Sequence, residues 1–274
     1  MNIFDCHIHM NNADVSPDEF LKRLTVGGVG RAILFSHHPS SFTVHDWSPA
    51  DDSAAARLSD IMKWADFSDR IIPFFWIDPL EGDAFEQADR AVEAGIAGFK
   101  VICNRFYPCD ERPMKLWAHI AKKNKPILFH SGILYVKGPS SAYNRPVNFE
   151  QLIDVPDLRF ALAHVSWPWC DECLAVYGHW QSEKHSDRST AEMFLDTTPG
   201  TPKIYRTELF KKIYGIGFDI EDNIIFGTDC VRDYNVDYLG KILEMDKEAL
   251  DAAGVSDARR EKYYNKNLLR FLGE

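Results

Sequence analysis

The 274-residue sequence has little of several features that would place it in other protein classes. Six cysteines are too few for a disulfide-stapled scaffold of this length. The 31 basic residues are outnumbered by 41 acidic ones, which disfavours binding to nucleic acid or to an anionic membrane. No apolar run is long enough to span a bilayer, and MNIFDCHIHM lacks the basic segment and apolar core of a signal peptide. We therefore expect a cytoplasmic protein with reduced thiols.

Short apolar runs alternate with longer amphipathic segments along the chain. The runs are continuously apolar, as in strands buried on both faces, and cover 2–8, 31–36, 71–77, 97–103, 126–131, 159–165, 193–198 and 223–229. Helical spacing occupies 16–24, 53–67, 83–95, 114–124, 170–180, 206–217, 236–245 and 258–272. This alternation predicts a (β/α)8 TIM barrel, an α/β fold, with residues 1–274 as a single domain. The main alternative, an open doubly wound sheet, would have a glycine-rich turn after the first strand, and DCHIHMNNAD has none.

Polar side chains gather at the C-terminal ends of the predicted strands. His7 and His9 end the first strand and, being two residues apart, face the same side, while Cys6 and Ile8 face the helices. Lys100 lies late in the fourth strand, and His130, His164 and Asp229 end the fifth, sixth and eighth. Each alone has a structural explanation, such as a packed histidine or a helix cap. In a barrel they meet at one mouth, where imidazoles and a carboxylate suit Zn²⁺, Fe²⁺ or Mn²⁺.

These stretches resemble the amidohydrolase superfamily, in its amidohydrolase-related (amidohydrolase 2) branch, nearly end to end. FDCHIHM resembles its opening His-x-His strand, FALAHVSWPWCDECLAVYG its strand-six histidine, IIFGTDC its strand-eight aspartate, and YYNKNLLRFLG its closing helix. The resemblance implies His7, His9, His130 and Asp229 as ligands of one divalent metal, with Zn²⁺ preferred and Mn²⁺ or Fe²⁺ as alternatives. It also implies that His164 lies beside the metal and polarises or protonates the substrate.

The resemblance leaves the reaction and the number of metals open. Members of the branch are hydrolases and lactonases, or decarboxylases, many of which have Glu in place of the first histidine. His7 therefore favours hydrolysis of a small organic acid derivative (a lactone, ester or amide), with Asp229 as general base and then general acid. The alternative is non-oxidative decarboxylation of an aromatic or unsaturated carboxylic acid. Lys100 would bridge two metals in a binuclear site, whereas with one metal it is a structural cation.

Two further classes are disfavoured by the same residues. TatD-type deoxyribonucleases also open with His-x-His, but they place a glutamate at the end of strand four, and GFKVICN has none. A non-catalytic barrel that senses a metal or a small molecule is the other class. The complete set of candidate metal-binding residues argues against it. We therefore expect an enzyme with a small-molecule substrate and no nucleic-acid or membrane partner. A homodimer is the default expectation for a soluble enzyme.

Candidate substrate-binding residues lie on the loops that follow the fourth, fifth and sixth strands. They are Arg105, Tyr107, Tyr143, Arg145 and Trp167. Arg105 either forks a substrate carboxylate or forms a surface salt bridge. His37, His38 and His45, on the loop after the second strand, are expected to be solvated, and Trp76 to be core.

Overall fold

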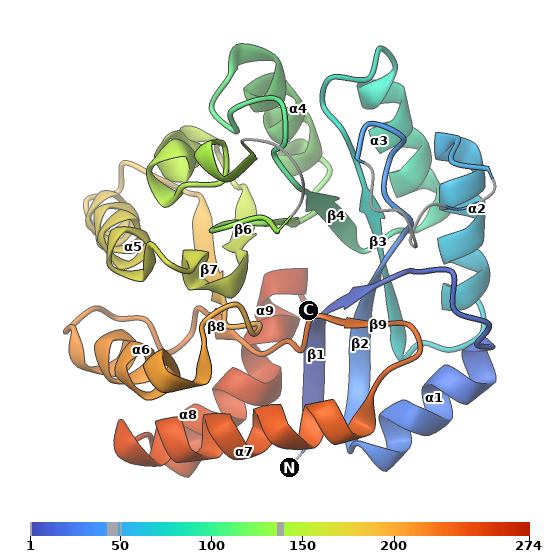
Figure 1. Ribbon diagram of the computed structural model, residues 1–274. Coiled ribbons are helices and arrows are strands. Elements are labelled where there is room, and N and C mark those ends of the chain that lie inside the picture. Colours follow the sequence, from blue (N-terminus) through green and yellow to red (C-terminus); the bar gives the residue numbers. More distant parts are fainter. Residues whose placement is uncertain (1, 43–48, 50, 136–139) are drawn as a thin grey trace.

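The computed structural model describes residues 2–42, 49, 51–135 and 140–274 as an α/β structure (Figure 1). Within these residues nine parallel strands form one curled sheet in the order β8-β7-β6-β5-β4-β3-β2-β1-β9. The strands are β1 (Ile3–His9), β2 (Val29–Phe35), β3 (Ile71–Trp76), β4 (Gly98–Val101), β5 (Ile127–Phe129), β6 (Arg159–Leu162), β7 (Glu192–Asp196), β8 (Ile224–Ile225) and β9 (Cys230–Val231). From β1 to β8 the neighbours in the sheet follow chain order without a reversal, and β9 lies beside β1, so the doubly wound alternative is excluded.

Helices follow the strands, and most of them lie around the outside of the curled sheet, whereas the last one lies at the centre of the ring (Figure 1). They are α1 (Pro17–Val26), α2 (Ala54–Ala65), α3 (Ala84–Ala94), α4 (Glu111–Lys122), α5 (Cys170–His185), α6 (Lys203–Gly215), α7 (Val236–Ala252), α8 (Asp257–Glu261) and α9 (Asn267–Leu272). Short 3₁₀ turns η1 (Ser140–Ala142), η2 (Pro146–Asp154) and η3 (Ala163–Ser166) and the π-helical turn η4 (Lys262–Lys266) complete the described elements. No helix among the described residues is long and apolar enough to cross a membrane.

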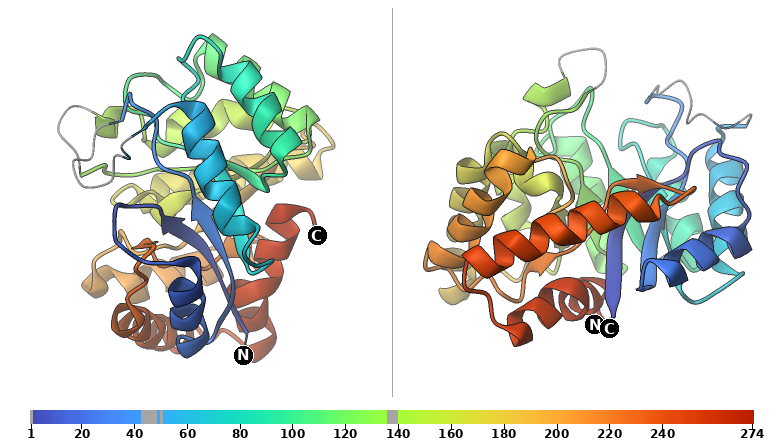
Figure 2. Two further views of the ribbon diagram at one scale, coloured as in Figure 1. Left: turned by 90° about the vertical axis from the view of Figure 1, so that its right-hand side faces the viewer. Right: turned by 60° about the horizontal axis from the view of Figure 1, so that its bottom comes forward.

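The enclosed face of the sheet has its own apolar cluster, separate from the one beneath the outer helices. It contains Phe4, Cys6, Ile33, Phe35, Ile72, Phe74, Leu128, Ala161, Ala163, Phe194 and Ile225. Leu268 and Phe271 of α9 pack against this inner cluster. Glu274 also pairs with Arg31 near the start of β2, and both termini lie at this end of the molecule (Figure 2). Helix α9 therefore covers the N-terminal end of the sheet and leaves the C-terminal strand ends for a site.

A bulge in β1 changes which side chains face inward. Between Asp5↔Ala32 and Ile8↔Leu34, β1 advances three residues while β2 advances two. Cys6 consequently joins the inner cluster next to His7, and Ile8 packs on the outer side. The prediction that Cys6 faces the helices is wrong, because strict alternation does not survive an inserted residue.

The predicted eighth strand, 223–229, is split in the structure. Its first part, β8, pairs with β7, whereas β9 pairs with β1 on the other edge of the sheet. Between them the Cys6 N–H donates to the Phe226 carbonyl at 2.9 Å. Asp229 lies in the bend with a φ of 60°, so it does not end a strand as predicted. The bend arises because this segment leaves one neighbouring strand and joins another.

The sixth strand and the closing helix also depart from the prediction. Strand β6 ends at Leu162, and His164, Val165 and Ser166 all have left-handed backbone angles, with φ of 60°, 43° and 58°. The predicted helix 258–272 is α8 and α9 joined by the π-helical turn η4. Both irregularities carry buried side chains that contact the C-terminal ends of the strands.

Candidate metal centre

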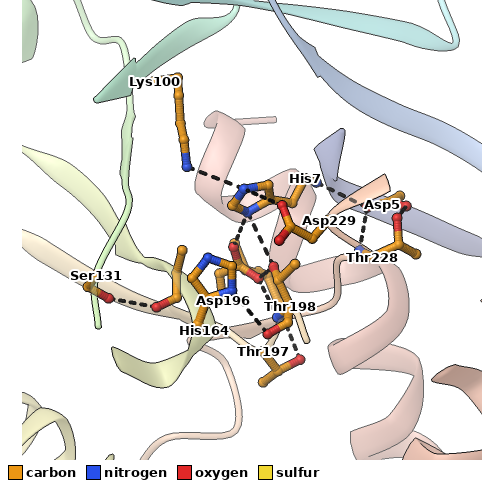
Figure 3. A network of polar contacts seen from close by, with 12 residues as sticks. Asp5, His7, Lys100, Ser131, His164, Asp196, Thr197, Thr198, Thr228 and Asp229 are labelled. Atoms are coloured by element: carbon orange, nitrogen blue, oxygen red, sulfur yellow. Dashed lines mark hydrogen bonds and ion pairs between the residues drawn. The ribbon is translucent and has the colours of Figure 1, made fainter. Parts of the chain in front are cut away.

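Three potential metal ligands, His7, His9 and Asp229, converge at the C-terminal ends of the strands. Figure 3 shows His7 and Asp229 facing each other. His7 Nε2 and His9 Nε2 lie 3.1 Å apart. Asp229 Oδ1 lies 3.4 Å from each of these nitrogens. Ligands that share one ion at bond lengths of about 2.0–2.2 Å are themselves separated by roughly 3.0–3.5 Å. We call His7 Nε2, His9 Nε2 and Asp229 Oδ1 the triangle. Its spacing therefore fits one small divalent cation.

A buried carboxylate that sequence analysis did not single out fixes the orientation of His7. Asp196 ends β7, and its Oδ2 lies 2.6 Å from His7 Nδ1. Because a carboxylate only accepts, Nδ1 carries the proton and the Nε2 lone pair is directed into the triangle. Asp196 Oδ1 in turn accepts from the backbone N–H of Thr198 at 2.7 Å and from the Thr198 hydroxyl. The arrangement is the carboxylate–histidine pair that commonly supports a metal ligand.

The β1 strand is anchored on its outer side by a second buried carboxylate. Asp5 accepts hydrogen bonds from the His7 and Thr228 backbone N–H groups, the Thr228 hydroxyl and the Tyr234 hydroxyl. Burial raises the pKa of Asp5 to about 7, although these hydrogen bonds oppose the increase. Asp5 thereby ties His7 to the segment that carries Asp229.

Lys100 is fully buried and reaches the same triangle. Its Nζ lies 3.3 Å from His7 Nε2 and 4.8 Å from the centre of the Phe35 ring. Burial lowers the pKa of Lys100 to about 8, although Asp196 and Asp229 oppose the decrease. The two carboxylates outnumber the one ammonium group, so the centre holds an excess of negative charge when the imidazoles are neutral. A bound divalent cation would compensate that charge.

The protonation states of the triangle favour metal binding. Burial lowers the pKa of His7 and of His9, and the positive charge of Lys100 acts in the same direction. Burial alone would raise the pKa of Asp229, but its hydrogen bond with His9 and the neighbouring imidazoles outweigh this and hold the pKa well below its usual range. Neutral imidazoles and an ionised carboxylate are the forms that bind metals.

His130 and His164 lie beside the triangle, with their ring centroids 5.0 Å apart. His130 immediately follows β5, and burial lowers its pKa well below the usual value. Among the described residues, no hydrogen-bond partner reaches the buried Nε2 of His130. This buried, neutral and unsatisfied nitrogen fits the role of a further metal ligand, although it is not part of the three-residue cluster.

His164 is held in an unusual backbone conformation. Its Nδ1 lies 3.4 Å from the Thr198 carbonyl, and its ring centroid lies 5.4 Å from that of His7. The Ser131 hydroxyl donates to the Ala163 carbonyl at 2.6 Å, and the Ser166 hydroxyl donates to Ser131 Oγ at 2.8 Å. These bonds flank residues 164–166, whose left-handed backbone conformation is unfavourable for residues other than glycine. Strain of this kind is typical of positions where a side chain must be aimed.

An aromatic cavity of about 280 Å³ opens over the triangle. His9, His130, His164 and Asp229 form its polar part. Its walls are Phe42, Trp76, Ile102, Ile133, Leu134, Tyr135, Trp167, Pro199 and Gly200. About 34% of the Asp229 side chain is exposed, which makes this carboxylate accessible to a bound molecule. The cavity suits a small, largely apolar molecule with one oxygen-bearing group directed at the metal centre.

Of the predicted substrate residues, Trp167 is the one that lines this cavity within the described part of the chain. Arg105 instead donates to buried Asp78 at 2.6 Å while half of its side chain is exposed. Tyr107 and Tyr143 pack edge to face with centroids 4.8 Å apart. Arg145 pairs with Glu172. The structure therefore places Trp167 beside the metal centre. The other four predicted residues make contacts away from the cavity.

Several residues of the site were missed by sequence reasoning. Trp76 is buried with Phe42 and Ile102, as expected for a core residue, and its ring also lines the cavity, 5.6 Å from that of His9. His37 and His38 were expected to be solvated, but both are buried: His37 Nε2 lies 3.5 Å from Asp60 Oδ2, and the His38 ring packs edge to face on the Trp76 ring. His45 lies outside the described residues. The signal for Asp196 was available, since an acidic residue ends the apolar run EMFLD.

Comparison with known proteins supports this description of the fold. Similar solved structures include a 2,6-dihydroxybenzoate decarboxylase complexed with 2,6-dihydroxybenzoate, at a TM-score of 0.68 and 19% identity over 100% of this chain and 99% of that chain. A probable 2-pyrone-4,6-dicarboxylic acid hydrolase from Acinetobacter baumannii, with citric acid bound, has a TM-score of 0.64 and 11% identity over 100% of both chains. A mutant 5-carboxyvanillate decarboxylase from Novosphingobium aromaticivorans, with bound manganese, has a TM-score of 0.64 and 12% identity over 99% and 97%.

At these identities the likenesses establish the fold, not the reaction. No protein with a curated description matches this sequence. The family described as Amidohydrolase (Amidohydro_2) matches residues 4–273, which confirms the resemblance seen in the sequence. Because that match covers nearly the whole chain, the protein belongs to the amidohydrolase family and is an enzyme.

Proposed function

We propose that this enzyme is a metal-dependent hydrolase of a small lactone, ester or amide of an organic acid. The observation that carries the proposal is the triangle of His7 Nε2, His9 Nε2 and Asp229 Oδ1, with edges of 3.1–3.4 Å, at the floor of an apolar cavity. His7, His9 and Asp229 would hold one divalent metal, with His130 as a further ligand. Zn²⁺ is the preferred ion, and Mn²⁺ and Fe²⁺ accept the same ligands.

The roles of the protein groups follow from their positions. A bound divalent metal supplies Lewis acidity, which lowers the pKa of a water ligand and polarises a carbonyl. Asp229 accepts a proton as the water oxygen attacks the carbonyl carbon, and returns it to the leaving oxygen or nitrogen as the acyl bond breaks. With Nδ1–H directed at the Thr198 carbonyl, His164 in its doubly protonated form would donate a hydrogen bond from Nε2 to the carbonyl oxygen as that oxygen gains charge. Trp167 and Trp76 exclude water around the substrate body.

A second candidate is non-oxidative decarboxylation of an aromatic or unsaturated carboxylic acid. The aromatic and aliphatic walls of the cavity favour it, because a dry site destabilises a carboxylate relative to the transition state in which its charge spreads into the ring. In this reaction the bond from the ring carbon to the carboxyl carbon breaks, CO₂ leaves, and His164 or Asp229 delivers a proton to the carbon. Lys100 is a structural cation in both proposals.

Metal analysis tests the part that both candidates share. We expect purified protein to contain about one equivalent of a transition metal, and His7→Ala and Asp229→Asn to lose it. His185→Ala and Asp69→Asn, at exposed positions, are matched controls that should retain the metal. A wild-type protein without stoichiometric metal, with the His7 and Asp229 variants indistinguishable from it, would rule out the metal site.

The reaction itself is tested with lactones, esters, amides and aromatic carboxylates. Hydrolysis releases acid from neutral substrates, whereas decarboxylation releases CO₂ from carboxylates. Acid release that depends on Asp229 supports the first candidate. Release of CO₂ without any hydrolysis contradicts it and supports the second.

Several broader features belong to the same proposal. The backbone bond from Cys6 to Phe226 and the pairing of β9 with β1 support closure of the sheet into a (β/α)8 barrel. We propose that residues 1–274 form one domain, that the enzyme acts in the cytoplasm as a homodimer, and that its partner is a small-molecule substrate. The free cysteines fit a reducing compartment.

A further inference from the structure

A buried polar network lies on the side of β7 that faces α6, α7 and η4. We call it the Thr197 network, and its members are Thr197, Arg206, Asp246 and Tyr263, all buried. Arg206 Nε donates to Asp246 Oδ1 at 2.8 Å, and Arg206 Nη1 donates to the Thr197 carbonyl at 2.5 Å. The Tyr263 hydroxyl lies 2.7 Å from Asp246 Oδ2 and 2.7 Å from Thr197 Oγ1. Thr197 is thus held at both its backbone and its side chain.

The hydrogen bonds of this network have a defined direction. Burial, together with the charge of Asp246, raises the pKa of Tyr263 well above its usual value, so the phenol keeps its proton. That proton goes to the Asp246 carboxylate, which only accepts. The Thr197 hydroxyl must therefore donate to the Tyr263 oxygen, because its other contact, the Ile225 carbonyl, is more distant at 3.3 Å. The chain runs from Thr197 through Tyr263 to the ion pair of Asp246 and Arg206.

Thr197 stands between the two residues that orient the imidazoles of the site. Asp196 holds His7 Nδ1 at 2.6 Å, and the Thr198 carbonyl lies 3.4 Å from His164 Nδ1 (Figure 3). The Thr198 hydroxyl also contacts both Asp196 and His7. A displacement of Thr197 would move its two neighbours, and with them His7 and His164.

The π-helical turn is independent evidence that the position of Tyr263 matters for the site. Such turns are rare and occur frequently at functional sites, because they insert a residue into a helix. The inserted residue rotates everything after it by about 100°. Here it lets Tyr263 reach Thr197 while Leu268 and Phe271 still pack in the inner cluster.

The ion pair in the network also needs an explanation other than stability. A buried Arg–Asp pair usually stabilises a protein no more than a well-packed apolar pair of the same volume. Its hydrogen bonds, however, specify position, since each is satisfied in one geometry only. Arg206 and Asp246 come from α6 and α7, so the pair transmits the packing of two outer helices to the end of β7.

We propose that Arg206, Asp246 and Tyr263 are positioning residues, which hold Thr197 so that Asp196 and Thr198 set the orientation of His7 and His164. The effect on metal binding rests on the proposed metal centre. The effect on His7 itself does not, because Asp196 contacts Nδ1 of His7, whereas the proposed metal centre uses Nε2. Two readouts therefore separate the two proposals.

The experiment compares Tyr263→Phe with Tyr264→Phe, the same substitution one residue later in the same turn. Tyr264 contacts the rings of Phe226 and Tyr263 and is not part of the Thr197 network. The first readout is the NMR signal of the His7 Nδ1 proton, which lies far downfield when it is bonded to a buried carboxylate. The second is the Zn²⁺ dissociation constant, measured by chelator competition.

We expect Tyr263→Phe to shift or broaden the His7 signal and to raise the Zn²⁺ dissociation constant by about 3- to 10-fold. This rise is smaller than the one expected when a residue hydrogen-bonded directly to a metal ligand is lost. Tyr264→Phe should leave both at the wild-type value. Thr197→Val should reproduce the effect of Tyr263→Phe, and the double variant should add little to either, because both remove the same link.

An unchanged His7 signal and unchanged Zn²⁺ affinity in folded Tyr263→Phe or Thr197→Val overturns the proposal, even if the melting temperature falls. An additive double variant overturns it as well. If the wild type binds no Zn²⁺, the proposed metal centre fails, while the His7 signal still decides whether the network positions the imidazole.

Discussion

Asp196 shows how one side chain decides the chemistry of another at the residue scale. Its Oδ1 accepts from the Thr198 backbone N–H, and its Oδ2 faces His7 Nδ1. The two oxygens therefore have different partners, and their roles cannot be exchanged. The carboxylate makes His7 Nδ1 a donor and leaves the lone pair of the ring on Nε2, the form that can bind a metal.

Asp196→Asn should move the ring proton of His7 from Nδ1 to Nε2. The asparagine oxygen stays with the Thr198 donor, so its NH₂ group faces His7 Nδ1, which must then accept and leave the proton on Nε2. We expect the metal dissociation constant to rise by about 10- to 100-fold with the fold unchanged. Chelator competition measures this, with Asp69→Asn at an exposed position as the control. Wild-type affinity in Asp196→Asn would mean that Asp196 does not set the tautomer.

Individual residues of the site could be predicted where a polar or charged side chain interrupts an apolar segment. His7, His9 and Asp229 stood out because imidazoles and a carboxylate interrupt apolar runs, and the structure brings these three together. Cys6 was assigned to the wrong side because its orientation depends on a bulge that no local pattern encodes. Arg105 had two open interpretations, and in the structure it pairs with Asp78. Neither outcome can be derived without the neighbouring strand or loop.

At the scale of elements, the strained turn after β6 depends on a glycine from another strand end. Gly132, with a φ of 92°, lies against this turn, and a Cβ there would be 2.3 Å from the Trp167 carbonyl oxygen. The Ile133 N–H also donates to that oxygen at 2.8 Å. The turn that carries His164 is therefore packed directly onto the chain after β5.

Gly132→Ala should displace the His164 turn. We expect the free energy of unfolding to fall by at least about 2 kcal/mol, because backbone strain and a backbone clash add. Gly217→Ala is the matched control, with a φ of 89° and no atom within 4 Å of the added Cβ, and should cost only about 1 kcal/mol. Denaturant unfolding measures both, and activity should fall in the Gly132 variant alone. Equal losses in the two variants would show that the clash is relieved without consequence.

The start of β7 is tied to two helices by a partly buried carboxylate. Glu192 Oε1 accepts from Lys184 Nζ at 2.7 Å and from Arg270 Nη2 at 3.0 Å. Burial alone would raise the pKa of Glu192, but the hydrogen bonds and charges of these two cations outweigh it and lower the pKa. The folded state therefore binds this proton more weakly than the unfolded chain does. Its contribution to stability is present above the unfolded pKa and is lost as pH falls through the folded value.

Glu192→Gln should consequently destabilise the protein in a pH-dependent way. We expect a loss of about 1 kcal/mol in the free energy of unfolding at pH 7, which becomes smaller toward pH 3 as Glu192 of the folded protein becomes protonated. Glu244→Gln, at an exposed position on α7, is the control and should show no such difference. Denaturant unfolding at both pH values is the measurement. A loss that is the same at pH 7 and pH 3 would assign the effect to packing instead of charge.

Elements were predictable as far as periodicity determines them. The strands and helices lie close to the predicted segments, because each buries one continuous run or one helical stripe. The failures are the early end of β6, the split between β8 and β9, and the π-helical turn in 258–272. In each, tertiary contacts override local preference: His164 must face the cavity, Asp229 must bend to the triangle, and Tyr263 must reach Thr197.

At the scale of the whole molecule, the two ends of the curled sheet carry different kinds of residues. Helix α9 packs against the inner cluster at the N-terminal ends of the strands, while the left-handed turn 164–166 and the three potential metal ligands lie at the C-terminal ends. Strand alternation predicted this division, because active sites of barrels form at the C-terminal face. The shape of the cavity was not predictable, because it depends on loops whose course no periodicity describes.

Metal removal should destabilise the whole molecule, because a cation that joins β1 to the segment between β8 and β9 binds only the folded chain. At a free metal concentration about 100-fold above the dissociation constant, this linkage contributes about 2.7 kcal/mol. For a chain of this size it corresponds to a fall in melting temperature of about 5–10 °C on chelation. Thermal unfolding with and without a chelator measures the difference. Restoring Zn²⁺ should restore the melting temperature.

His7→Ala separates this linkage from a general effect of the chelator. The variant lacks one corner of the triangle, so its melting temperature should be the same with and without chelator, whereas His185→Ala should respond as the wild type does. A fall of equal size in the His7 variant would place the stabilising ion elsewhere. A wild-type melting temperature that does not respond to chelation, in protein shown to hold metal, would mean that the strand ends keep their arrangement through Asp5, Asp196 and Lys100 alone.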